Sequence, residues 1–151
     1  MGGHVRVALF IDWQNTYKSA REAFGWTAFP NEFGNYSPYA LGRTLAEANG
    51  RGGSGALVRV NVHRGLPSQA RDPASYAANR RQSAAWIAEA PDVVVPRLRP
   101  LRYGNQDEPP REKGVDVELA LAAAEWVLGE KCDVAIVFSH DTDLVPLVEM
   151  I

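Results

Sequence analysis

The chain has 151 residues, which is enough for one domain with a sizeable hydrophobic core but too few for two. Its 16 basic and 18 acidic residues give a formal net charge of -2, which excludes a globally basic surface, so a polyanion would have to bind a local patch. The single cysteine, Cys132, excludes an internal disulfide, and no apolar run approaches the roughly 18 residues of a membrane span. We therefore expect a cytoplasmic protein that has no contact with a membrane.

The N-terminal part of the chain alternates predicted strands with predicted helices. A loop rich in aromatic residues occupies residues 26–36, and a glycine-rich turn occupies residues 51–55. In chain order, the predicted elements are a strand at residues 5–11, helices at residues 15–24 and 39–48, a strand at residues 56–63 and a long helix at residues 73–90.

The C-terminal part continues the alternation. A strand at residues 92–98 leads into residues 99–112, which contain three prolines and are predicted to form a loop or an irregular hairpin. A helix follows at residues 115–128, then a strand at residues 134–138 and a last helix that begins near Thr142.

Apolar spacing predicts which helix faces are buried. In the helix at residues 115–128, apolar side chains recur every three or four residues, which is typical of one buried face. In the helix at residues 73–90, the inward candidates are Tyr76, Ala84, Ile87 and Ala88.

The order of the elements predicts an α/β fold with a mainly parallel sheet of four or more strands. The strand at residues 134–138 is apolar throughout, which favours a position in the middle of the sheet with both faces buried. A Rossmann nucleotide-binding domain is disfavoured, because neither a G-x-G-x-x-G turn nor a P-loop is present. We expect residues 1–151 to form a single domain that is cut short at its C-terminal end, because the last helix has no cap.

Acidic side chains follow two of the predicted strands and begin one helix. Asp12 comes directly after the first strand, Asp141 and Asp143 follow the strand at residues 134–138, and Asp116 lies in the first turn of a helix. Ligand sites of parallel sheets lie beyond the carboxyl ends of the strands, so these acids are predicted to converge at one edge. An oxygen-only site of this kind prefers Mg²⁺ or Mn²⁺ and suits phosphodiester cleavage by a metal-activated water.

Each acid also has a simpler explanation. Asp12 with Asn15 can cap the first helix, and Asp116 is favoured by the helix dipole in the first turn of its helix. Asp141 and Asp143 can form a turn with an N-cap. The functional interpretation therefore depends on the coincidence of these positions rather than on any one of them.

Three sequence blocks resemble the signature blocks of the NYN domain, a PIN-like nuclease family. They are F-I-D-W-Q-N at residues 10–15, K-G-V-D-V-E-L-A-L-A at residues 113–122 and F-S-H-D-T-D-L-V-P-L at residues 138–147. The resemblance implies a three-layer PIN-like (Rossmannoid) fold and a metal-dependent ribonuclease site. It assigns Asp12, Asp116 and Asp141 as catalytic and metal-binding acids, Asp143 as a further metal ligand, and Asn15 and Ser139 as supporting polar groups.

Two positions depart from the family pattern. Family members commonly carry another aspartate two turns into the middle helix, where this chain has Ala122. The site thus loses one carboxylate unless Glu118 or Glu125 replaces it, and on a helix Glu118 faces away from Asp116. His140 stands where the family turn usually has glycine, and histidine tolerates the left-handed backbone better than most residues.

Basic residues are concentrated before the middle helix and are predicted to bind RNA, with Tyr103 among them as a stacking aromatic. An ordinary solvated loop is the alternative explanation, because acidic residues dilute the patch. The predicted RNA-binding residues are Arg97, Arg99, Arg102, Arg111 and Lys113.

Two functions remain open from the sequence. The first is an Mg²⁺- or Mn²⁺-dependent endoribonuclease, a phosphodiester hydrolase that cleaves single-stranded or structured RNA. The second is a catalytically weakened module of the same fold that binds RNA or a protein partner. A homodimer is also compatible with the sequence, because an incomplete sheet edge invites pairing.

Overall fold

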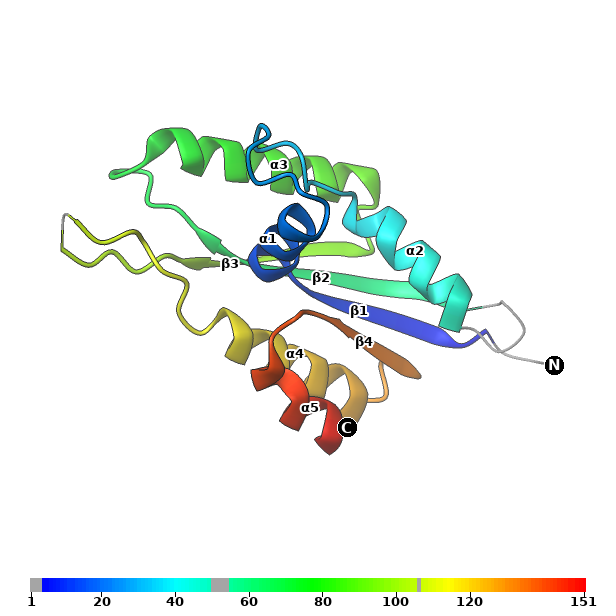
Figure 1. Ribbon diagram of the computed structural model, residues 1–151. Helices are drawn as coiled ribbons and strands as arrows, with labels where there is room; N and C mark the ends of the chain where they lie inside the picture. The colour runs from blue at the N-terminus through cyan, green and yellow to red at the C-terminus, as the bar shows by residue number, and fades with distance from the viewer. Residues whose placement is uncertain (1–3, 50–54, 106) are drawn as a thin grey trace.

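The computed structural model describes residues 4–49, 55–105 and 107–151 (Figure 1). The predicted turn at residues 51–55 therefore lies outside the described residues except for Gly55. The elements in chain order are β1 (Arg6–Asp12), α1 (Trp13–Ala23), α2 (Pro38–Asn49), β2 (Ala56–Leu66), α3 (Pro73–Glu89), β3 (Val94–Pro100), α4 (Val115–Leu128), β4 (Val134–Phe138), the 3-10 turn η1 (Thr142–Leu144) and α5 (Val145–Met150).

The strands form one parallel sheet in the order β3-β2-β1-β4, and helices cover both of its faces (Figure 1). The predicted three-layer α/β architecture is therefore confirmed. In the register, Ile11 of β1 lies opposite Phe138 of β4, and Asp12 lies opposite His63 of β2. All four strands run the same way, so their carboxyl ends lie at one edge.

Each face of the sheet carries its own hydrophobic cluster. On one face, Phe10 of β1 packs with Leu119 of α4 and Leu147 of α5. On the other, Ile11 packs with Trp13 of α1 and Trp86 of α3. Successive residues of β1 thus serve opposite layers, as the alternation of side chains along a strand requires.

The predicted position of the strand at residues 134–138 is wrong. Within the described residues β4 lies at the end of the sheet next to β1, and every one of its residues is only half-buried. The inner strands are β1 and β2, and both contain fully buried residues. A continuous apolar run indicates a strand in a parallel sheet, but it does not say which strands lie on either side.

The predicted inner face of α3 is also wrong. Asn79, Ser83 and Trp86 are buried, whereas Ile87 remains 42% exposed. Of the other inward candidates, Ala84 and Ala88 are exposed and Tyr76 is half-buried. Two polar residues occupy core positions of this helix, so apolar spacing points to the wrong face.

The boundaries of the other elements differ from the predictions in small ways. β3 begins and ends two residues later than predicted, and β2 continues past His63 to Leu66. Pro73 begins α3 behind an Asp72 cap, and α4 has its predicted limits.

Among the helices of the described ranges, none has the length and the apolar content to cross a bilayer. The assignment of residues 1–151 to a single domain stays a prediction.

One buried arginine organises the aromatic loop between α1 and α2. The Arg21 side chain is only 9% exposed, and its guanidinium donates hydrogen bonds to backbone carbonyls of the loop at 2.6–3.3 Å. The acceptors are the carbonyls of Thr27, Phe29, Pro30 and Phe33. Gly34 is required nearby, because it has a φ of 109° and a Cβ there would lie 2.7 Å from Cγ of Arg21.

Replacing Arg21 by methionine removes these donors while keeping an unbranched apolar stem. We expect Arg21→Met to lower the free energy of unfolding by about 1–3 kcal/mol, because the partly buried loop carbonyls lose their charged donor. Urea unfolding measures this loss, and chymotrypsin should cut faster after Phe33. Arg43→Met, at an exposed position of α2, is the control and should change stability by less than about 0.5 kcal/mol. Equal stability of the two variants would contradict a structural role for Arg21.

Candidate functional site

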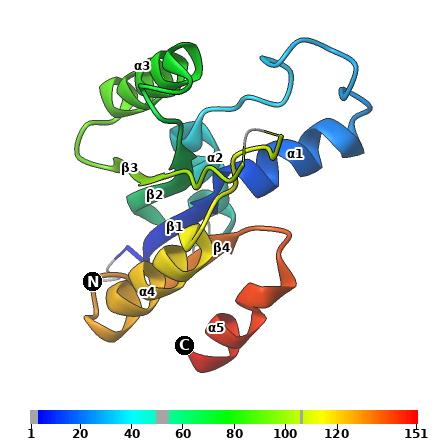
Figure 2. The same cartoon turned by 90° about the vertical axis from the view of Figure 1, so that its left-hand side faces the viewer.

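The predicted acids lie at the carboxyl-end edge of the sheet, which faces the viewer in Figure 2. Asp12 ends β1 at the centre of this edge. Asp141 follows β4 on one side, and Asp116 lies in the first turn of α4, which packs against β1 and β2. Parallel pairing therefore brings positions more than 100 residues apart to one place.

A hydrogen-bond network joins the end of β1 to the turn after β4. The Ser139 hydroxyl lies 3.3 Å from both Oδ2 of Asp12 and Oδ1 of Asn15, and it can donate to either. Oδ1 of Asn15 also accepts from the backbone N–H of His140 at 2.6 Å. The Ser139 hydroxyl accepts from the backbone N–H of Asp141 at 3.0 Å. Asn15 and Ser139 thus hold the two acid-bearing turns together.

Two of the acids also cap their helices, as the simpler explanation predicted. Oδ1 of Asp12 accepts from the N–H of Asn15 at 3.3 Å and caps α1. Oδ1 of Asp141 accepts from the N–H of Asp143 at 2.9 Å and caps η1. Asp116 lies in the first turn of α4 behind Gly114, whose φ is 73°. Capping uses one oxygen of each of the two capping carboxylates and orients the other.

Asp12 occupies the electrostatic centre of the group. Its side chain is only 6% exposed. Burial raises the pKa of Asp12, hydrogen bonds from Asn15 and Ser139 oppose this, and the charges of Asp141 and Asp116 raise the pKa further. The charges of Asp141 and Asp116 therefore act on Asp12. A cation at this edge would relieve both the burial penalty and the mutual repulsion.

The donor chemistry of this edge fits a hard divalent cation, since every candidate ligand is an oxygen. In the described ranges, no group of three or more His, Cys, Asp or Glu side chains is gathered closely enough to hold a metal ion. Mg²⁺ usually binds through one or two carboxylates and retains several waters, so it does not require three converging carboxylates. Asp143 is exposed, and its backbone N–H bonds to Asp141.

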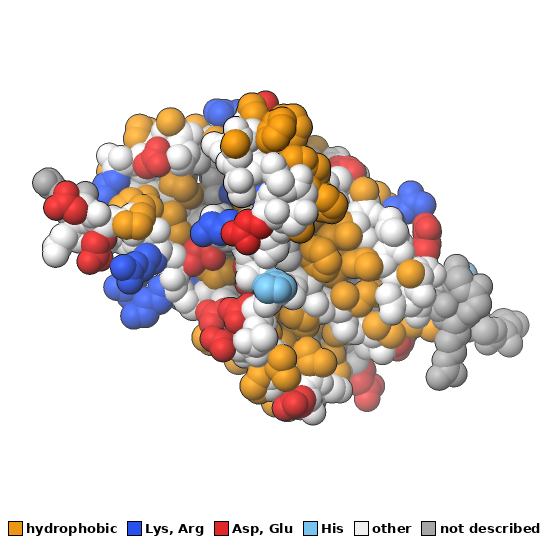
Figure 3. All heavy atoms as spheres, viewed as in Figure 1, with side chains coloured by type: hydrophobic (Ala, Val, Ile, Leu, Met, Phe, Trp, Pro, Cys, Tyr) orange, Lys and Arg blue, Asp and Glu red, His pale blue; other side chains and the backbone are white. Residues whose placement is uncertain are grey.

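The predicted RNA-binding residues divide into two groups. Arg99, Arg102 and Lys113 line a groove of about 480 Å³ beside the start of α4. Arg111 instead lines a hollow near α1. The backbones of Arg102 and Arg111 pair through hydrogen bonds of 2.8 and 2.9 Å, which confirms an irregular hairpin. Figure 3 shows basic side chains gathered along the lower side of this projecting hairpin.

Glu118 neutralises part of this basic patch. Its carboxylate lies 3.1 Å from Nε of Arg97 and 3.6 Å from Nη1 of Arg99. The prediction that Glu118 faces away from the acids agrees with these pairs. Ala122 packs within the hydrophobic cluster of α4 and is 8% exposed, so this position adds no polar group to the acidic edge.

Sequence reasoning missed a buried histidine beside Asp12. His63 is 1% exposed, and neither of its ring nitrogens has a hydrogen-bond partner among the described residues. Burial lowers the pKa of His63 to about 4, while Glu118 opposes this effect and Arg97 adds to it. The only sequence signal was its place near the end of a strand. A neutral imidazole therefore flanks the acidic edge.

The sheet order, the helices on both faces and the acids at the carboxyl-end edge define a PIN-like α/β protein. The NYN domain family model matches residues 6–151. The chain therefore belongs to the NYN domain family, within the PIN-like nuclease superfamily. No curated protein and no solved structure matches it.

The buried His63 predicts a pH dependence of stability. Its pKa in the folded state, about 4, lies below its ordinary value of 6.5, so folding favours the neutral ring. This contribution is complete above pH 6.5 and is lost as the pH falls towards 4, up to about 3 kcal/mol. As the pH falls from 7 to 5, the free energy of unfolding of the parent should drop by about 2 kcal/mol more than that of His63→Leu, because leucine does not titrate.

Urea unfolding of both proteins at several pH values measures this difference. The raised pKa of Asp12 acts in the opposite direction, but it is common to the two proteins and cancels in the comparison. Parallel stability profiles of the parent and the variant would show that His63 does not titrate in this range.

Proposed function

We propose that this NYN domain protein is an endoribonuclease that depends on Mg²⁺ or Mn²⁺ and cleaves single-stranded or structured RNA. Membership of a PIN-like nuclease family supports the nuclease class. The observation that carries the proposal is the electrostatic coupling of Asp12 to Asp141 and Asp116 at the carboxyl-end edge of the sheet. Phosphodiester hydrolysis needs a place where a cation and a phosphate can meet, and the proposal assigns this role to the acidic edge.

The residues of the edge have distinct roles in this proposal. Asp12, Asp116 and Asp141 hold the cation, and Asp143 lies close enough along the chain to assist. When bound, the cation supplies an activated water and neutralises charge on the phosphate. Asn15 and Ser139 keep the two acid-bearing turns in register through their hydrogen bonds. The free cysteine, Cys132, is compatible with the reducing cytoplasm as the site of action.

A second candidate function is a binding module with weakened catalysis, which would hold RNA or a protein partner. The observation that favours it is Ala122, which lies in the apolar cluster where the family pattern commonly has an aspartate. Retention of Asp12, Asp116 and Asp141 favours the nuclease. Cleavage measurements separate these two functions.

Replacing Asp116 by asparagine tests the nuclease directly. We expect the parent protein to degrade a mixed RNA with Mn²⁺ or Mg²⁺ but not with EDTA. Asp116→Asn should lower the rate by on the order of 100-fold or more, because several kcal/mol of transition-state stabilisation depend on the cation. Cleavage is followed on a gel with a labelled RNA.

Asp92→Asn is the matched control, because Asp92 is exposed and precedes β3 at the opposite end of the sheet. It should retain full activity. Mn²⁺ should also raise the melting temperature of the parent and of Asp92→Asn more than that of Asp116→Asn. Equal cleavage by all three proteins would indicate a contaminating nuclease. RNA binding without cleavage in the parent would favour the binding module.

The basic groove beside α4 gives a separate prediction about affinity. Arg102 and Lys113 line this groove, and Glu118 pairs with Arg97 and Arg99 instead. The double variant Arg102→Gln, Lys113→Gln should therefore weaken RNA binding in EDTA, and the slope of log affinity against log salt should fall by about 1.4 for two lost contacts. Arg97→Gln should have a smaller effect, because Glu118 already neutralises its charge.

Fluorescence anisotropy with a labelled single-stranded RNA measures both quantities. Arg81→Gln, on the exposed face of α3, is the control for a general loss of positive charge. The same loss of affinity in the control and in the double variant would show that the groove has no special role.

A further inference from the structure

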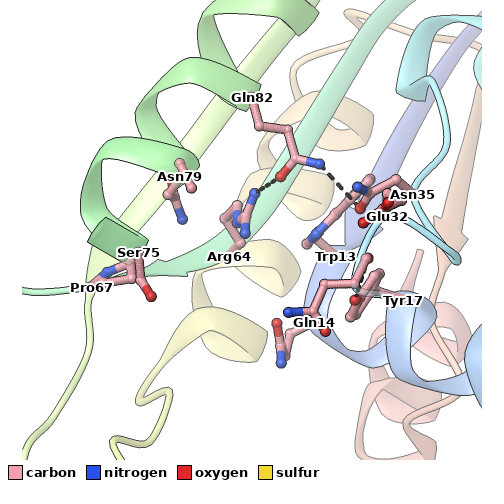
Figure 4. A pocket seen from close by; sticks show the side chains of 12 residues that line it. Trp13, Gln14, Tyr17, Glu32, Asn35, Arg64, Pro67, Ser75, Asn79 and Gln82 are labelled. Atoms are coloured by element: carbon pink, nitrogen blue, oxygen red, sulfur yellow. Dashed lines mark hydrogen bonds between the residues drawn. The ribbon is translucent and has the colours of Figure 1, made fainter. Parts of the chain in front are cut away.

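A second cleft lies beside the acidic edge, between α1 and α3. Its volume is about 660 Å³, within the usual range for ligand sites. Figure 4 shows Arg64 at its centre, between Asn79 and Gln82 of α3 and Trp13 and Gln14 of α1. Because Trp13 directly follows Asp12, the cleft begins next to the acids.

Within the described part of the chain, Arg64 forms no ion pair or hydrogen bond with a carboxylate, although Glu32 lines the same cleft. Its guanidinium lies 5.6 Å from the ring centre of Trp13 and 5.5 Å from that of Trp86. Nη1 donates to Oε1 of Gln82 at 2.5 Å, and Nε is buried without a partner. Arg64 forms no ion pair with any of the described residues.

The charge of Arg64 persists despite its surroundings. Burial lowers the pKa of Arg64 to about 10, and Glu112 opposes this effect. The guanidinium is therefore protonated at neutral pH. Glu112 acts on this charge but forms no ion pair with it, so the guanidinium can still bind an incoming anion directly.

Amide side chains surround this cation. Asn79 is 4% exposed, and its Nδ2 donates to the carbonyl of Gly65 at 3.1 Å, while its Oδ1 is buried without a partner. Nε2 of Gln82 donates to Oδ1 of Asn35 at 3.2 Å. Gln14 lines the same cleft. Amides both donate and accept hydrogen bonds, as recognition of the edge of a nucleobase requires.

The cleft continues into an adjoining hollow in which basic side chains outnumber acidic ones. This hollow of about 530 Å³ shares Arg64 and Asn79 with the cleft and is also lined by Lys18, Arg111 and Glu112. On the opposite side of the cleft, the ring of Tyr17 forms part of the wall. Sites for single-stranded nucleic acids typically place cationic groups along the phosphate backbone of the strand, with aromatic rings beside the bases.

We propose that the Arg64 cleft binds one nucleotide of the RNA strand, adjacent to the phosphate that lies at the acids. Arg64 holds the phosphate of this nucleotide, and Asn79 with Gln14 contacts the base. This inference rests on the proposed ribonuclease function and identifies a nucleotide subsite of the same site. The four nucleoside 5′-monophosphates and inorganic phosphate serve as probes.

The first experiment is a titration of ¹⁵N-labelled protein in EDTA, which separates binding from cleavage. We expect nucleoside monophosphates to shift the side-chain amide signals of Asn79 and Gln82 and the indole signal of Trp13. Inorganic phosphate should shift fewer of these signals and bind more weakly. Equal shifts and equal affinity for phosphate and for every nucleotide would overturn the base contact, and no shifts in the cleft would overturn the whole subsite.

The second experiment uses variants and a labelled single-stranded RNA in EDTA. Arg64→Met should weaken binding about tenfold, whereas Arg80→Met, exposed on α3, should not change it. Ala78→Glu places a carboxylate on the wall of the cleft at an exposed helix position and should weaken binding similarly, with Ala85→Glu as its matched control. Ala78→Glu keeps the test decisive if Arg64→Met fails to fold.

Failure of the subsite and failure of the nuclease give different results. If Asp116→Asn abolishes cleavage but Ala78→Glu and Arg64→Met bind RNA as the parent does, the nuclease stands and the subsite is wrong. If no protein cleaves RNA but the cleft variants lose nucleotide binding, the subsite stands and the catalytic proposal is wrong.

Discussion

Everything at the candidate site depends on the parallel pairing of β1 with a neighbour on each side. Every residue of β1 from Val7 to Ile11 is fully buried, and its side chains serve two different hydrophobic clusters. A shift of the register by one residue would turn each side chain of β1 to the opposite face of the sheet, so the hydrophobic packing fixes the register. Asp12 is consequently fixed opposite His63 on one side and beside the turn after β4 on the other. The proximity of the acids is a property of the sheet.

Local signals in the sequence were sufficient for most elements of the fold. Apolar runs identified the strands, and the limits of α4 followed from helical spacing between Gly114 and Gly129. The convergence of Asp12, Asp116 and Asp141 also followed, because parallel strands deliver their carboxyl ends to one edge. The capping interpretation of Asp12 is confirmed, and its two oxygens have different partners, because Oδ1 accepts from the N–H of Asn15 and Oδ2 from the Ser139 hydroxyl.

Features that arise only from tertiary packing could not be predicted. The edge position of β4 depends on which strands pair, which its own apolar run does not specify. The inner face of α3 contains Asn79 and Ser83, so hydrophobic periodicity failed there. Arg64 looks like an ordinary solvent-exposed residue in the sequence, and its unpaired charge emerges only when two tryptophan rings enclose it. In each case the partner is distant along the chain.

The Arg21 contacts have a consequence for how this protein can diversify. The guanidinium binds main-chain oxygens of the aromatic loop and none of its side chains, so these hydrogen bonds do not depend on which side chains the acceptor residues carry. Asn31, Glu32 and Asn35 of the same segment form one wall of the Arg64 cleft. Mutations at those positions can therefore change ligand preference while the scaffold stays intact, so selectivity can evolve here with little loss of stability.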